Sequence, residues 1–359
     1  MKKIWIVSLI IVIVISSAIM GFAISIFAVN IDTSYDPYTD YAATVVDKRG
    51  KLETHEYIKK IDDNDINGLF PELNEGEGNI SALPKYDIDL YRITYKSVCL
   101  YEIVTLSGLV IIPQKQGKLS HVQYHHYTLF PYDCGNGESN LDAPSLYDGE
   151  YPETQYLQYE TRLFGNYLGS HGYLVSLPDY IGYGVSDSYE HTYSVNDRLA
   201  EQSVDMILAT RELCSMLNVE LDGKLFFSGW SEGAAAALAT QKLIESDYKD
   251  RLKVTANAPL AGFYNTGFYG RVFINLAPFL PIDFGSEFND LIWAAYAINQ
   301  YTDDKPLDNS DIFKFEVNNQ LDVTKNRPTN VLSGMFKYFI VGKDRLFSKF
   351  AQNELAHDW

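Results

Sequence analysis

One pentapeptide constrains this chain more than any other feature. Gly229-Trp230-Ser231-Glu232-Gly233 follows the apolar segment Leu225–Ser228 and precedes an Ala-rich run that begins at Ala234. A serine between a buried strand and a helix sits on a sharp, strained turn, which holds its hydroxyl clear of the sheet. Gly229 and Gly233 lack a Cβ atom, so strand and helix can approach closely around the serine. The sequence therefore predicts that Ser231 is a nucleophile on an elbow shaped by these glycines.

The helix that follows the serine adds an electrostatic expectation. The N-terminus of a helix favours negative charge, because its first backbone N–H groups have no partner within the helix. We therefore expect the backbone N–H of Glu232 to donate a hydrogen bond to an oxyanion that forms next to Ser231.

Strand-like and helix-like segments alternate along most of the chain. Strand-like segments begin at Asp87 and recur as "YEIVTLSGLVIIP", "SHVQYHH", "YLVSLP", "KLFFSG" and "LKVTANAPLAG". Helical patterns cover residues 154–170, residues 196–217 and the run that begins at Ala234. This order predicts an α/β fold whose mostly parallel sheet has helices on both faces.

Charge and cysteine content narrow the class of partner. The 359-residue chain has a formal net charge of −18, and such a field repels a phosphate backbone, so we do not expect nucleic acid as a partner. Cys99, Cys134 and Cys214 lack metal-ligand spacing, and we expect neither a metal nor another cofactor. Cys214 fits a helix as a small core residue. Pairing of Cys99 with Cys134 stays open, because sequence alone does not give the geometry that a disulfide requires.

The first 31 residues indicate the compartment. Two N-terminal lysines precede a stretch that runs to Ile31 without a charged residue, and a bilayer span needs about 20 residues. We expect residues 4–29 to be an uncleaved membrane anchor, with the lysines in the cytoplasm and the body of the chain outside. The alternative is a signal peptide cleaved near Gly21 and Ala23, which would release a secreted protein.

Six segments occur in one order: "YDIDLYRITYKS", "LSGLVIIP", "YHHYT", "HGYLVSLPDYIGYGVSD", "HTYSVNDRLAEQSVDMILATREL" and "GWSEGAAAALA". Together they resemble the secretory lipase family of α/β-hydrolases and its bacterial relatives. The resemblance covers approximately residues 86–359, and the "PDYIGYG" and "GWSEGA" blocks are its most specific parts. It implies an α/β-hydrolase fold, a helical lid inserted at approximately residues 263–345, and activity on esters.

The resemblance also implies a second oxyanion N–H from the turn at Tyr127 and Thr128. The family usually has His-Gly-Thr there, whereas this chain has His126-Tyr127-Thr128, so Tyr127 should narrow the acyl side of the site or change the turn. We interpret His125 and His126 as turn and core residues. His191 precedes the nucleophile in the chain, and we interpret it as structural.

A serine nucleophile needs a base and an acid that orients the base. In this fold they follow the serine in the order acid, then histidine. His357 is the one histidine after Ser231. We therefore expect the acid, the histidine loop and the last strand and helix to be missing, so that the chain is truncated at its C-terminus and inactive or nearly so. The alternative within the chain is Asp344 as the acid and His357 as the base.

These expectations divide the chain into an N-terminal anchor or signal peptide (1–31), a polar stalk and lead-in (32–85) and an incomplete α/β-hydrolase domain (86–359). The function they favour is a serine carboxylic-ester hydrolase that acts on a small-molecule or lipid ester through an acyl-enzyme on Ser231. A serine peptidase of the prolyl-oligopeptidase type would use the same core. A catalytically inactive, truncated surface protein is the third alternative.

Overall fold

The computed structural model describes residues 48–66, 84–100, 102–129, 139–151, 157–262, 264, 287–301 and 307–312. Within these ranges the strands are β1 Leu52–Ile61, β2 Ile88–Cys99, β3 Glu102–Pro113, β4 Leu119–His125, β5 Leu174–Pro178, β6 Leu221–Trp230 and β7 Ala256–Leu260. The α-helices are α3 Asp63–Ile66, α4 Tyr167–Ser170, α5 Asn196–Met216, α6 Glu232–Asp247, α8 Glu287–Tyr301 and α9 Asn309–Ile312. A π-helical turn, η5, covers Thr161–Asn166, and short 3₁₀ turns are η3 Ser139–Asp142, η4 Pro144–Leu146 and η6 Gly184–Ser186.

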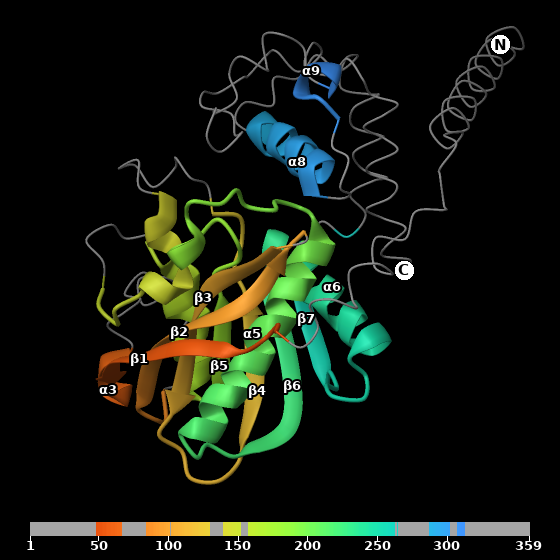
Figure 1. The fold of residues 1–359 in the computed structure, drawn as a ribbon. Coiled ribbons are helices and arrows are strands. Elements are labelled where there is room, and N and C mark those ends of the chain that lie inside the picture. Colours follow the sequence, from red (N-terminus) through yellow and green to blue (C-terminus); the bar gives the residue numbers. More distant parts are fainter. Residues whose placement is uncertain are drawn as a thin grey trace, which may run out of the picture.

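The strands form one sheet in the order β1-β2-β3-β5-β4-β6-β7 (Figure 1). The pairs β5–β4, β4–β6 and β6–β7 are parallel, whereas β1–β2, β2–β3 and β3–β5 are antiparallel. In the parallel part, His125 at the end of β4 is in register with Gly229 of β6. The end of β4 therefore lies beside the serine elbow, and the expected α/β-hydrolase fold is confirmed.

Strand β1 is the main difference from the organisation expected from sequence. It lies in the segment interpreted as a polar stalk and lead-in, yet it pairs antiparallel with β2 over its whole length. Most of its side chains are exposed, because it is an edge strand of the described sheet. It therefore lacks the alternation of apolar and polar residues by which a strand is recognised in a sequence. The folded unit thus begins before residue 86.

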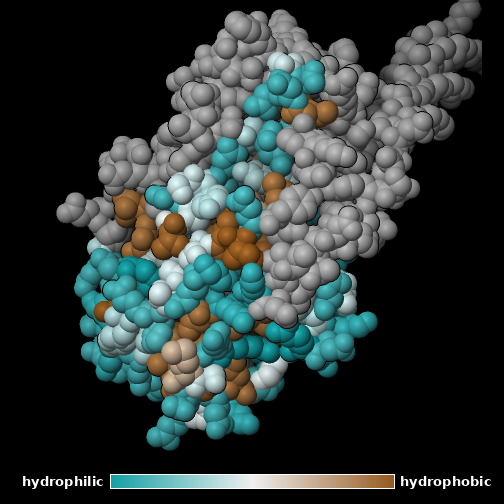
Figure 2. Space-filling view, viewed as in Figure 1, coloured by the Kyte–Doolittle hydropathy of each residue, from teal (hydrophilic) through white to brown (hydrophobic). Residues whose placement is uncertain are grey.

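Helices cover both faces of the sheet. On one face, Met206 and Leu213 of α5 pack against Ile93 and Val110 of the sheet, and α6 lies next to α5 (Figure 1). On the other face, Phe164 of η5 and Tyr167 and Leu168 of α4 pack in a second cluster. The surface that Figure 2 displays over the sheet is mostly hydrophilic, with small separate groups of hydrophobic side chains.

Helix α8 belongs to the segment expected to be a lid. It lies beyond the end of the sheet at which β6 meets α6 (Figure 1), and it contacts the loop that precedes α5. Trp293 stacks on Tyr193 with ring centroids 4.4 Å apart, and the Tyr301 hydroxyl donates a hydrogen bond to Glu190 Oε2 at 2.9 Å. No helix in the described ranges is long and apolar enough to cross a membrane. The expected anchor, residues 4–29, lies outside those ranges.

Candidate active site

Ser231 occupies the turn between β6 and α6. Its backbone has φ 55° and ψ −118°, a conformation that is strained for a residue with a side chain. Its N–H donates to Leu260 O at the end of β7, at 2.9 Å, and its C=O accepts from Ala234 N at 3.1 Å. The turn is thus fixed on both sides, and the half-buried serine stands at the N-terminus of α6.

The two glycines of the elbow lie where a side chain does not fit. A Cβ on Gly229 would lie 2.5 Å from Gly233 O, and a Cβ on Gly233 would lie 2.5 Å from His126 O and closer still to His125 O. These atoms are backbone and cannot move away as a flexible side chain can. The glycines are therefore required by the close packing of β6, α6 and the end of β4.

The expected oxyanion donors lie on either side of the contact between α6 and the end of β4. The N–H of Glu232 is in the first turn of α6, where backbone N–H groups have no partner within the helix. The N–H of Tyr127 already donates to Glu160 Oε2 at 2.7 Å. Among the described residues nothing accepts a hydrogen bond from Thr128 N–H. Of the two N–H groups in that turn, that of Tyr127 is therefore already engaged and that of Thr128 is not.

Glu160, just before η5, was not identified from the sequence. Its carboxyl group also accepts a hydrogen bond from the Tyr124 hydroxyl at 2.8 Å, and the side chain is buried. Burial raises the pKa of Glu160 to about 8, opposed by the hydrogen bonds from Tyr127 and Tyr124. No local signal points to it, because its partners lie more than 30 residues earlier in the chain.

The side chain of Glu232 turns away from the serine and into the core. Its Oε1 lies 2.9 Å from His191 Nε2, and both side chains are buried. His191 Nδ1 lies 2.8 Å from Ile181 O, so Nδ1 carries a proton and donates it to that carbonyl. The interpretation of His191 as structural fits these contacts, and the pair fastens the residue after Ser231 to the "PDYIGYG" loop.

Close packing explains the two glycines of the "PDYIGYG" loop. Gly182 has φ +92°, and a Cβ there would lie 2.7 Å from His191 N. Gly184 has φ +59°, and a Cβ there would overlap the carboxylate of Asp179, which accepts hydrogen bonds from Ser107 Oγ at 2.5 Å and Ser145 N at 2.8 Å. Burial raises the pKa of Asp179. The loop is therefore a packed support beneath the elbow, and its motif is structural.

The acid and base are not found near the serine in the described part of the chain. Ser231 Oγ makes no hydrogen bond with a described residue, and Asp344 and His357 lie outside the described ranges. His125 and His126 are buried, and burial lowers the pKa of His125 to about 3.

The described residues include no group of three His, Cys, Asp or Glu side chains that could hold a metal ion. Cys99 and Cys214 are free, and Cys134 lies outside the described ranges.

Comparison with known proteins gives a family similarity over part of the chain. The model of the secretory lipase family matches residues 149–271, which contain the "PDYIGYG" loop, α5 and the elbow. Over these residues the chain is similar to the secretory lipases. No curated protein matches it.

Solved structures similar to this chain include proteins of two bacteria. A protein of Legionella pneumophila subsp. pneumophila str. Philadelphia 1, provisionally assigned as a hydrolase, is 22% identical with a TM-score of 0.65, over 85% of this chain and 78% of that one. The rice cell wall degrading esterase LipA of Xanthomonas oryzae is 22% identical with a TM-score of 0.61, over 86% and 79%. A point mutant of LipA is 19% identical with a TM-score of 0.64, over 86% of this chain and 79% of that one. At these identities the likeness establishes the fold.

Proposed function

We propose that the chain is a serine carboxylic-ester hydrolase of the lipase or esterase kind, which forms an acyl-enzyme on Ser231. The observation that carries the proposal is the strained turn of Ser231 at the N-terminus of α6, with φ 55°. A buried glycine on each side supports it, since both permit a close approach that a simple Gly-Ser turn does not need. The match to the secretory lipase family over residues 149–271 supports the same reaction class.

In the proposed reaction, Ser231 Oγ attacks the ester carbonyl carbon and gives up its proton to a base. The negative charge that develops on the carbonyl oxygen is stabilised by hydrogen bonds from Glu232 N–H and the turn at Tyr127 and Thr128. The tetrahedral intermediate then expels the alcohol, which takes up the proton, and water hydrolyses the acyl-enzyme in the same manner. Asp344 and His357 are the candidates for acid and base within this chain.

The surroundings of Ser231 support a small-molecule or lipid ester as substrate. The rings of Tyr127 and Trp230 lie 5.9 Å apart, so aromatic groups flank the serine on the side where the family usually has a glycine. Trp230 is 48% exposed and is free to contact an apolar acyl chain. We place the reaction outside the cytoplasm, with the protein either anchored through residues 4–29 or secreted.

The test is active-site labelling of the full chain with a fluorophosphonate, followed by mass spectrometry of the labelled peptide. Ser231→Ala should abolish the label and reduce turnover of p-nitrophenyl esters by about 10³-fold or more. The matched control is Ser246→Ala, on the exposed face of the same helix, where the hydroxyl donates only to Leu243 O. This control should label and turn over as the unchanged protein does.

A parallel panel of p-nitrophenyl esters and peptide anilides separates the reaction classes. Faster turnover of the esters is expected, and a preference for anilides would favour a peptidase instead. A chain in which Ser231 takes no label and no ester is turned over would contradict the proposal and favour a binding role, whereas labelling of Ser231 without ester turnover would fit a nucleophile that lacks its acid and base.

A further inference from the structure

A cavity of about 550 Å³ lies away from Ser231, beside α5 and the far end of α6. It is bounded by the segment before β1, by α5 and by the loop after α6, and its polar lining consists of Arg49, Lys51, Arg211, Glu212, Tyr248 and Arg251. Helix α6 begins next to Ser231 and has 16 residues, so its far end is about 24 Å from the elbow. The cavity is therefore separate from the candidate active site.

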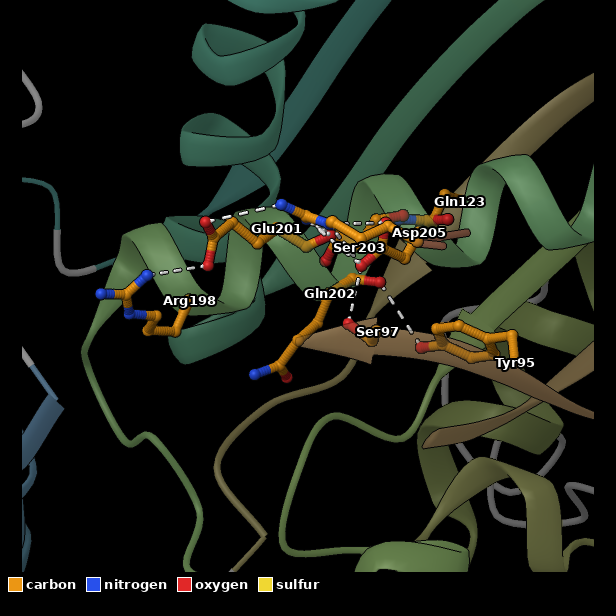
Figure 3. Close-up of polar contacts among 9 residues, drawn as sticks. Tyr95, Ser97, Gln123, Arg198, Glu201, Gln202, Ser203 and Asp205 are labelled. Carbon is orange, nitrogen blue, oxygen red and sulfur yellow. Dashed lines mark hydrogen bonds and ion pairs between the residues drawn. The ribbon is translucent and has the colours of Figure 1, made fainter. Parts of the chain in front are cut away.

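One of the four cations in this lining is neutralised within the protein. Arg49 donates to both carboxylate oxygens of Asp205 at 3.2 Å and pairs with Glu201 at 3.7 Å. Figure 3 shows Glu201 and Asp205 side by side on α5, with Asp205 hydrogen-bonded to Ser97 of β2. Arg49 is thus held in place and contributes little net charge to the cavity.

The other three cations have no such partner. In the ranges that the structure describes, no carboxylate lies within ion-pair distance of Lys51, Arg211 or Arg251. The Nε of Arg211 is buried without an acceptor, and its Nη1 reaches only Arg251 O at 3.3 Å. Burial and the neighbouring Arg251 both lower the pKa of Arg211. Glu212 accepts a hydrogen bond from Leu52 N–H at 2.9 Å.

Three cations without a carboxylate partner in one concavity are unexpected in a chain with a net charge of −18. Repulsion between Arg211 and Arg251 costs free energy that a bound anion would offset. We propose that this cavity binds the phosphate group of a phosphate ester. Guanidinium groups match phosphate oxygens with paired N–H donors, and a phosphate carries enough charge to satisfy more than one of them.

The size of the cavity favours a phosphate ester over inorganic phosphate as the ligand. A cavity of this volume is in the usual range for small-molecule sites, roughly 300–1,000 Å³, and free phosphate would fill only part of it. The phenol of Tyr248 lines the same cavity and can donate a hydrogen bond or cover an organic group. The ester can be a soluble one or the headgroup of an anionic phospholipid.

The test measures binding to the full chain by calorimetry with inorganic phosphate and glycerol 3-phosphate, and by flotation with phosphatidylglycerol or phosphatidylcholine vesicles. Arg211→Gln/Arg251→Gln should weaken binding by about 100-fold, since each charged hydrogen-bonding group contributes about tenfold. Arg251 is exposed, so Arg251→Gln alone, with about a tenfold loss, gives the result if the double variant does not fold.

The matched control is Lys118→Gln/Lys224→Gln, which removes the same charge from exposed positions that do not line the cavity. It should bind as the unchanged protein does. Binding of glycerol 3-phosphate that Arg251→Gln weakens supports a soluble ester, and a preference for phosphatidylglycerol vesicles that Arg251→Gln removes supports a lipid headgroup. No binding of either, or equal losses in Arg251→Gln and the control, would overturn the proposal. Ser231→Ala should leave this binding unchanged, so the result is independent of the hydrolase proposal.

Discussion

His191 Nε2 lies 2.9 Å from Glu232 Oε1, and both side chains are buried. Glu232 directly follows Ser231, and its backbone N–H is the proposed oxyanion donor, so this pair fastens the donor to a loop about 40 residues away. The hydrogen bond from His191 to Ile181 O completes the link. The pair is therefore a means of holding the first turn of α6 in place.

His191→Ala should destabilise the fold by about 3–5 kcal/mol, because it leaves the buried carboxyl group of Glu232 with only the long hydrogen bond from Ser194 N, at 3.3 Å. Glu232→Gln should cost less, since an amide can still form the hydrogen bond. Urea denaturation of the two single variants and of the double variant should give a coupling of about 1–3 kcal/mol. Additive losses would mean that the two side chains do not stabilise each other.

Gly233→Ala should destabilise the protein by about 3 kcal/mol or more, because the new Cβ would overlap the backbone oxygens of His125 and His126. Gly117→Ala is the matched control. Gly117, unlike Gly233, has a positive φ, +87°, and a Cβ there meets nothing within 4 Å, so its cost is limited to about 1–2 kcal/mol of backbone strain. The stabilities of the two variants are compared through their urea midpoints. Equal losses of stability would show that the elbow tolerates a side chain.

Glu160→Gln should flatten the dependence of stability on pH. The folded-state pKa of Glu160 is raised from 4.5 to about 8, so its contribution is fully present below about pH 4.5 and is lost as pH rises through about 8. Relative to Glu160→Gln, the unchanged protein should lose free energy of unfolding on the order of a few kcal/mol between about pH 5 and pH 9. Urea titrations at both pH values test this, and parallel curves for the two proteins would contradict it.

Arg49→Met should destabilise the fold by about 3–5 kcal/mol, because Asp205 is fully buried and would lose its cation. The control is Lys224→Met, which breaks an exposed pair with Asp222 at 3.9 Å and should cost less than about 1 kcal/mol. Thermal melts at one pH compare the variants. Similar melting temperatures would mean that Asp205 does not need Arg49, and that the segment before β1 is a dispensable lead-in.

Local features of the sequence determined the parts of the fold that depend on neighbouring residues. The strand, serine turn and helix around Ser231 are contiguous, so their pattern predicts the elbow without reference to the rest of the chain. The same holds for the "PDYIGYG" loop, where Gly182 and Gly184 adopt positive φ. The assignment of Ser231 as a nucleophile and of Glu232, Tyr127 and Thr128 as oxyanion donors stays a prediction.

Only the tertiary structure decided which distant groups meet. β1 is polar and mostly exposed, and it is a strand because β2 supplies its hydrogen bonds. Arg49 and Asp205 are 156 positions apart, and Glu160 reaches Tyr127 from 33 positions away. From sequence alone, a charged side chain is expected to be exposed to solvent. Whether it is buried, and which group it pairs with, depend on the packing of the folded chain. The sequence thus determined the local turn that presents the serine, and packing decided which carboxyl groups and cations surround and support it.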